Sequence, residues 1–172
     1  MSHLDRIWNG WRNEYVVDAG SRPPTGEGSL FTQILNSGLS DEDTNIVRRG
    51  TYTFGILNAF PYTPGHLMLL PYREVGDLED LTNDEHNELW LMVTQAVRAV
   101  KAAYVPGGVN VGINLGRPAG GSVSDHLHVH VLPRWSGDSN FMTAIAEART
   151  LPEALSQSAA KLRAAWPSTY AS

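Results

Sequence analysis

The sequence of Asp125–Arg134, D-H-L-H-V-H-V-L-P-R, places a histidine at every second position: His126, His128 and His130. Side chains alternate between the two faces of a β-strand, so this spacing predicts a strand with three imidazoles on one face. Apolar residues stand between the histidines and would pack into a core. Imidazole changes charge near neutral pH, so this face can hold phosphate, transfer a proton, attack as a nucleophile or bind a metal.

The composition is that of an ordinary globular chain. There are 172 residues, of which 42% are hydrophobic and 18% charged, and we expect a single domain large enough to bury a core. The net charge of −5 does not attract the phosphate backbone of a nucleic acid, so no nucleic-acid partner is expected. Phosphate chemistry would therefore need a local site.

Features missing from the sequence narrow the chemistry further. There are no cysteines, which excludes disulfides, a thiolate nucleophile and a cysteine-type zinc site. No apolar run approaches the ~18 residues of a membrane span. The N-terminus has no signal-peptide pattern. We expect a cytoplasmic protein with no membrane partner.

Hydrophobic periodicity and turn residues divide the chain into helices and strands. A capping box of Thr82 and Glu85 starts the clearest helix, and Pro106 ends it. Further helices are predicted over residues 3–18, over Phe31–Leu35 and from Pro152 onwards. Besides the histidine strand, strands are predicted over Thr51–Asn58, His66–Tyr72 and Val109–Leu115. Helices and strands come in separate runs with short links, which is typical of an α+β fold with an antiparallel sheet.

Three explanations of the histidine strand are open from the residues alone. The rings could be ordinary core or surface histidines, or imidazoles at i and i+2 could share a zinc ion. In the third, which we favour, His128 attacks phosphorus and forms a phospho-imidazole intermediate. Its attacking nitrogen must be unprotonated, so the other ring nitrogen must donate to a carbonyl or a carboxylate. The flanking imidazoles and backbone N–H groups would stabilise charge on the phosphate oxygens.

The loop Gly116–Ser122, G-R-P-A-G-G-S, comes directly before this strand. Its glycines let the backbone approach a phosphate closely, and successive N–H groups could form an anion nest. Three further polar residues stand at strand ends: Asn58, His66 and Asn114. Asn114 could bond a sugar or phosphate oxygen, but both asparagines could also be turn caps. A lone histidine such as His66 is more often structural.

These segments together resemble one known family. H-L-H-V-H-V-L (residues 126–132) resembles the signature of the histidine triad superfamily, His-φ-His-φ-His-φ-φ with φ apolar, at every position. I-L-N-A-F-P-Y-T-P-G-H-L-M-L-L-P-Y-R (residues 56–73) is similar to the family segment with an Asp or Asn followed by P-x-x-P-G-H. L-E-D-L-T (residues 78–82) resembles the start of the family's long helix, and N-L-G-R-P-A-G-G-S (residues 114–122) occupies its nucleotide-phosphate loop. The resemblance covers about residues 45–135.

The resemblance implies a nucleotidyl hydrolase or transferase that acts on an α-phosphate. It also implies a five-stranded antiparallel sheet with helices. The expected assembly is a homodimer or higher homo-oligomer, with a ten-stranded sheet across a dimer. Within a single domain over 1–172 we expect an N-terminal helical extension and linker over 1–29, the core over 30–136 and a C-terminal helical segment over 137–172.

The family motif also implies roles for individual residues. His128 matches the nucleophile, and His126 and His130 match the flanking histidines that orient it and contact phosphate. His66 matches the fourth family histidine, and Asn58 the residue that binds ribose hydroxyls. The other predicted phosphate-binding residues are Asn114, Gly116, Gly120, Gly121 and Ser122. Ser122 stands where hydrolases of the family often carry Gln, Ser or Thr, and it is also expected to take part in catalysis.

Three features are similar to a bacterial branch of the family described as diadenosine tetraphosphate phosphorylases. They are Gly121-Ser122 in place of Gly-Gln, W-x-x-W-R-x-x-Y at Trp8–Tyr15 and P-R-W-x-G-D-x-N-F at Pro133–Phe141. Such enzymes resolve the nucleotidyl-histidine with inorganic phosphate and release ADP and ATP. A small serine leaves room for this second anion, so the expected partners are a nucleotide substrate and inorganic phosphate.

Other functions remain as alternatives. The same site could hydrolyse dinucleoside polyphosphates or nucleoside phosphoramidates, or the protein could be a nucleotide-binding interaction protein in which catalysis is incidental. A metal-dependent enzyme is disfavoured, and no cofactor is expected to be required. The structural zinc of some family members would have no cysteine ligands here, so no zinc is expected. Magnesium is left only as a counter-ion of the polyphosphate.

Overall fold

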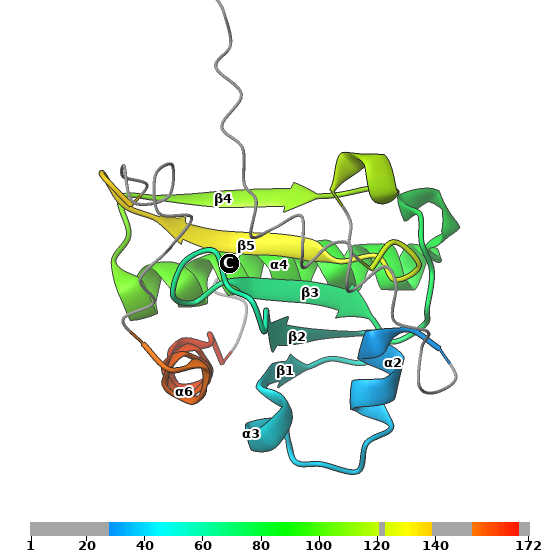
Figure 1. Cartoon of the computed structure of the whole chain (residues 1–172), viewed down its shortest axis with the longest axis horizontal. Coiled ribbons are helices and arrows are strands. Elements are labelled where there is room, and N and C mark those ends of the chain that lie inside the picture. The colour runs from blue at the N-terminus through cyan, green and yellow to red at the C-terminus, as the bar shows by residue number, and fades with distance from the viewer. Residues whose placement is uncertain (1–27, 121–122, 139–152, 169–172) are drawn as a thin grey trace, which may run out of the picture.

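The computed structural model describes residues 28–120, 123–138 and 153–168. Its elements are α2 (Leu30–Leu35), α3 (Asp41–Thr44), β1 (Ile46–Arg49), β2 (Thr53–Leu57), β3 (Leu67–Pro71), the 3-10 helix η1 (Leu78–Asp80), α4 (Asn83–Tyr104), β4 (Gly108–Ile113), the 3-10 helix η2 (Arg117–Ala119), β5 (Val129–Arg134) and α6 (Leu155–Ala165). The strands form one antiparallel sheet in the order β1-β2-β3-β5-β4 (Figure 1). The predicted α+β fold with a five-stranded antiparallel sheet is confirmed.

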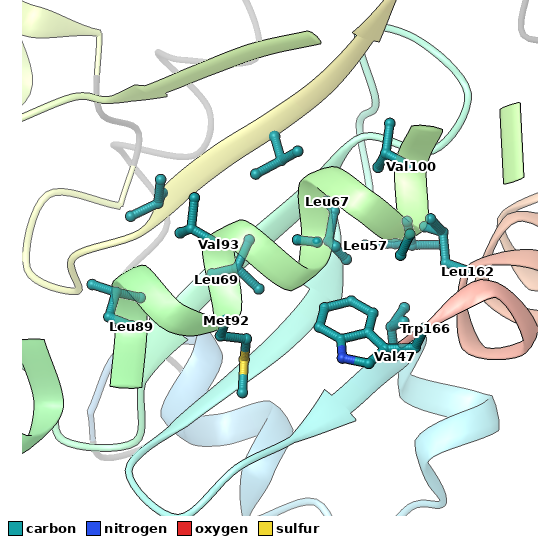
Figure 2. Close-up of a cluster of buried hydrophobic side chains, with 14 of the residues drawn as sticks. Val47, Leu57, Leu67, Leu69, Leu89, Met92, Val93, Val100, Leu162 and Trp166 are labelled. Atoms are coloured by element: carbon teal, nitrogen blue, oxygen red, sulfur yellow. The ribbon is translucent and has the colours of Figure 1, made fainter. Parts of the chain in front are cut away.

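The long helix α4 covers one face of the sheet (Figure 1). Its residues Leu89, Val93, Ala96 and Val100 are buried and pack against the side chains of β3 and β5 that point to the same face. Leu162 of α6 and Trp166, which directly follows α6, belong to the same cluster, as Figure 2 shows. Burial of apolar area between the sheet, α4 and α6 supplies the main driving force for the fold.

The start of α4 is fixed by the predicted capping box. The Thr82 hydroxyl accepts the backbone N–H of Glu85, and the Glu85 carboxylate accepts the backbone N–H of Thr82. Arg73 donates to both carboxylate oxygens of Glu85, at 2.9 and 2.7 Å. This hydrogen-bonded ion pair lowers the pKa of Glu85 to about 2.

The opposite face of the sheet carries α2. Phe31 of this short helix is buried with Ile46, Phe54 and residues of β3 in a second apolar cluster. Strand β3 is buried along its whole length because Leu67 and Leu69 face the α4 cluster while its alternate residues face the α2 cluster. The apolar run L-M-L-L-P is therefore that of a central strand covered on both faces.

Helix α6 holds the edge strand β1 in place. The Arg163 guanidinium donates to the backbone carbonyls of Ile46 and Asp41, each at 2.6 Å. The Trp166 indole N–H donates to the side chain of Gln95 on α4 at 3.1 Å. One C-terminal helix thus joins the edge of the sheet to the helix that covers it.

Most predicted elements are found with shorter ends, but two of their start points are wrong. The ladder of the histidine strand begins at Val129 and not at Asp125, because β4, its partner, ends at Ile113 opposite Val129. Helix α6 begins at Leu155 and not at Pro152. Glu153 lies just outside the helix, where its carboxylate accepts the hydroxyls of Tyr104 and Ser158.

Other differences concern elements that were not predicted and residues that are not described. Periodicity did not indicate α3 or β1, which are four residues long each. The predicted helix over 3–18, most of its linker and Pro152 itself lie outside the described residues. Within the described ranges, no helix is long and apolar enough to cross a membrane.

Candidate active site

The three histidines of the motif face the α2 side of the sheet. Leu127, Val129 and Val131 point to the α4 cluster, so the alternation predicted for the strand holds even before its ladder begins. The His128 and His130 rings lie 4.8 Å apart, centroid to centroid. The predicted row of imidazoles is therefore present.

His128 is held as a neutral ring with a defined tautomer. Its Nδ1–H donates to the backbone carbonyl of His126 at 2.8 Å, and because a carbonyl can only accept, the ring lone pair lies on Nε2. Burial lowers the pKa of His128, since a charged ring would lose its hydration there. An unprotonated Nε2 is the form needed to attack phosphorus.

His126 is fully buried, and both of its ring nitrogens have protein partners. Nε2–H donates to the carbonyl of Pro71 at 2.8 Å, and Nδ1 lies 2.6 Å from the Ser29 hydroxyl. Burial lowers the pKa of His126, and the Pro71 carbonyl and the Glu74 carboxylate oppose that shift. In this arrangement both ring nitrogens are bound within the protein, so His126 is placed to orient the neighbouring His128.

His66 joins the motif by a hydrogen bond to His130. The Tyr62 backbone N–H donates to His66 Nδ1 at 3.2 Å, so the proton of the neutral His66 ring is on Nε2. That Nε2–H donates to His130 Nδ1 at 2.9 Å. The structure therefore brings the predicted fourth histidine to the motif, as a buried partner that fixes the His130 ring.

The turn before His66 is tightly packed. Gly65 has a φ of 75°, which favours glycine, and a Cβ built there would lie 2.5 Å from the Tyr104 ring. Asn58 closes the other end of this turn, where its Oδ1 accepts the backbone N–H of Phe60 at 3.0 Å. The turn-cap explanation of Asn58 is thus confirmed. Its amide also lies 3.4 Å from His66 Nδ1, so it stands beside the site.

The glycine loop leaves β4 at its C-terminal end. Gly116 and Gly120 have φ values of 76° and 101°, which explains why glycine stands at both positions. Asn114 is half-buried at the base of the loop, and a Cβ on Gly120 would lie 3.9 Å from its amide nitrogen. Gly121 and Ser122 lie outside the described residues.

Comparison with known proteins identifies the family. A family model described as HIT domain matches residues 40–137. The chain belongs to the HIT domain family. The match covers every motif residue of the site, including Asn58, His66 and the three histidines of the strand.

Curated relatives of this HIT protein are enzymes by name. It is 44% identical over 167 residues to a Mycobacterium tuberculosis protein named AP-4-A phosphorylase, a match that covers 95% of this chain and 85% of the relative. It is 34% identical over 82 residues to a Dictyostelium discoideum bis(5'-adenosyl)-triphosphatase, a match that covers 48% of this chain and 54% of the relative.

Solved structures give the same fold. A Zn-bound histidine triad family protein from Mycobacterium smegmatis superposes with a TM-score of 0.65 at 25% identity, covering 80% of this chain and 92% of that one. In the described part of the present HIT protein, no group of three or more His, Cys, Asp or Glu residues is arranged to hold a metal ion.

Sequence reasoning missed two residues of the site, Ser29 and Phe31. The Phe31 ring centroid lies 5.5 Å from that of His126 and 5.7 Å from that of His128, so it packs against both rings. Phe31 was predicted as part of a helical turn, and Ser29 as part of a linker. No local pattern could place them, because 97 residues separate Ser29 from His126.

Proposed function

We propose that this protein is a nucleotidyltransferase that cleaves diadenosine tetraphosphate with inorganic phosphate. The observation that carries the proposal is the hydrogen bond from His128 Nδ1–H to the His126 carbonyl, which leaves a lone pair on Nε2. The 44% identity to a protein named AP-4-A phosphorylase supports this choice of substrate and acceptor.

The reaction has two displacements at one phosphorus. His128 Nε2 attacks the α-phosphorus of the dinucleotide, the bond to the bridging oxygen breaks, and ATP leaves. The intermediate is an adenylyl group on His128. An oxygen of inorganic phosphate then attacks the same phosphorus, the P–N bond breaks, and ADP is released with His128 restored. Covalent catalysis splits one difficult transfer into two easier ones.

Other residues support these two steps. His130, held by His66, lies beside His128 and can donate to the phosphate oxygens. Asn58 is proposed for the ribose hydroxyls, and Asn114, with the loop Gly116–Ser122, for the phosphates. Ser122 would hold the attacking phosphate. These two displacements use no metal in the site, and magnesium serves only as a counter-ion of the substrate.

A second candidate is hydrolysis by the same intermediate, with water in place of phosphate. The identity to a bis(5'-adenosyl)-triphosphatase over about half the chain favours it. To distinguish phosphorolysis from hydrolysis, purified protein would be incubated with diadenosine tetraphosphate, with and without inorganic phosphate. The products would be identified by ion-exchange chromatography. ADP and ATP formed only with phosphate are expected. AMP and ATP formed without phosphate would establish the hydrolase.

We also propose a cytoplasmic homodimer. Among the described strands, the edge strand β4 has only one neighbour in the sheet, and Val111 on it is 44% exposed. An unpaired strand edge can pair with a second copy, which would give the ten-stranded sheet that the family resemblance implies. The cytoplasm is proposed because it holds the nucleotides and phosphate of the reaction. Light scattering of the purified protein would test the dimer.

A further inference from the structure

The first turn of α2 touches the histidines from outside the segment that the HIT family model matches. Ser29 is the N-cap of this helix, and its Oγ lies 2.6 Å from His126 Nδ1. Two residues later, the buried Phe31 ring packs against both His126 and His128. Because Phe31 is fixed in the apolar cluster, the turn that carries Ser29 has a defined position.

The direction of each hydrogen bond follows from the donors present. The Pro71 carbonyl can only accept, so Nε2 of His126 carries the proton and Nδ1 of the neutral ring accepts. The Ser29 hydroxyl must then donate to Nδ1. Its oxygen in turn accepts the backbone N–H of Thr32 at 3.2 Å. The hydroxyl is therefore held by the helix on one side and bound to the ring on the other.

Glu74 holds this arrangement in place. Its carboxylate accepts the backbone N–H of Ser29 at 2.6 Å and the hydroxyl of Thr32 at 2.9 Å. The hydrogen bond from Ser29 is the main cause that lowers the pKa of Glu74, so the group is charged at neutral pH. The Ser29 hydroxyl also lies 3.2 Å from the Thr32 hydroxyl, but its single proton goes to His126 Nδ1, which is the closer acceptor at 2.6 Å.

We propose that Ser29 is a positioning residue for the nucleophile. Its hydroxyl and the Pro71 carbonyl hold the His126 ring at two points. The backbone carbonyl of His126 in turn accepts His128 Nδ1–H. The orientation of the His128 lone pair therefore depends on a residue outside the triad motif. This inference rests on the proposed nucleotidyl transfer.

Turnover of four variants tests the role of the hydroxyl. Ser29→Ala and Ser29→Gly should each lower kcat/KM roughly tenfold to a hundredfold, as loss of orienting groups does elsewhere. Ser29→Thr should stay within about threefold of wild type, because it keeps a hydroxyl and an N-cap. Ser29→Gly is the decisive variant, since glycine is nearly as good an N-cap as serine but has no hydroxyl.

Ser40→Ala is the matched control. Ser40 is the N-cap of α3, where its Oγ accepts the backbone N–H of Asp43 at 3.2 Å, and it does not contact the histidines. This variant removes one N-cap hydroxyl of the same type and should leave kcat/KM unchanged. A similar loss in Ser40→Ala and Ser29→Ala, with Ser29→Gly fully active, would reduce Ser29 to a helix cap and overturn the proposal.

The ¹⁵N signal of His126 Nδ1 gives a second measurement that needs no turnover. In wild type it should lie at the position of an unprotonated nitrogen that accepts a hydrogen bond. In Ser29→Ala and Ser29→Gly it should move to the position of a free lone pair, and Ser29→Thr should restore it. An unchanged signal in both would refute the proposal. If wild type turns over no dinucleotide, the proposed function fails, and this signal alone decides whether Ser29 positions His126.

Discussion

Replacing Gly65 by alanine should damage both stability and the site, because the added methyl group has no room. The built Cβ lies 2.5, 2.9 and 3.1 Å from three carbons of the Tyr104 ring, whereas carbon atoms pack at about 3.5–4.0 Å. The ring cannot simply withdraw. Its hydroxyl donates to Glu153 at 2.9 Å, and its edge packs against Trp135 with ring centroids 6.3 Å apart.

Two costs add in this variant. The positive φ of Gly65 costs an L-residue about 1–2 kcal/mol, and overpacking costs about 1–3 kcal/mol. We expect a loss of about 2–5 kcal/mol in the free energy of unfolding, or roughly 4–20 °C in Tm for a chain of this size. His66 follows directly in the chain, so kcat/KM should also fall roughly tenfold as the ring is displaced.

Gly38 provides the matched control. Its φ is 73°, but a Cβ there has nothing within 4 Å. Gly38→Ala should therefore cost only the backbone strain of about 1–2 kcal/mol and should leave activity intact. Urea unfolding and kcat/KM would be measured for both variants. Equal destabilisation of the two, or a Gly65→Ala enzyme with wild-type activity, would refute the reasoning.

Four further predictions concern the nucleophile, the acceptor and one ion pair. His128→Ala should abolish turnover but still bind nucleotide; residual activity within about tenfold of wild type would exclude the covalent intermediate. Burial lowers the pKa of His128 from 6.5, so kcat/KM for the dinucleotide should fall on the acid side only below pH 6.5, where the ring becomes protonated. A fall in kcat/KM that begins above pH 6.5 would contradict the assignment. Ser122→Gln should shift the products from ADP towards AMP, and an unchanged ratio would remove the proposed phosphate position. The pKa of Glu85 is lowered from 4.5 to about 2, so its contribution to stability is complete above pH 4.5 and is lost as the pH falls towards 2. Unfolding midpoints of wild type should therefore fall more steeply across this range than those of Glu85→Gln, and parallel curves would argue against the ion pair.

The sequence was most informative where one local pattern determines the structure. Alternation placed the three imidazoles on one face, and Thr82 with Glu85 marked the start of α4, because both depend on residues a few positions apart. That His66 belongs to the site came from the family resemblance rather than from any spacing, and its pairing with His130 came only from the structure. The motif thus predicted which histidines belong to the site, and the structure added which residues they contact and where the protons of the rings lie.

The remaining features depend on contacts between distant segments. Strand β1 is four residues long, which is too short to show a strand pattern, and it is held by Arg163 from α6. The ladder of β5 starts where β4 ends, which no residue of the histidine motif reveals. Ser29 reaches His126 only because α2 packs on the sheet. Such features follow from tertiary packing and not from local periodicity.

The hydrogen bonds of Arg163 to Ile46 and Asp41 span 117 and 122 residues. On the ribosome, β1 and β2 are synthesised long before Arg163 leaves the exit tunnel. Until then the nascent sheet has an open edge at β1 and lacks Leu162 and Trp166 from its core. During synthesis this edge is therefore the part of the sheet most open to pairing with another chain, and α6 completes the core beside it last.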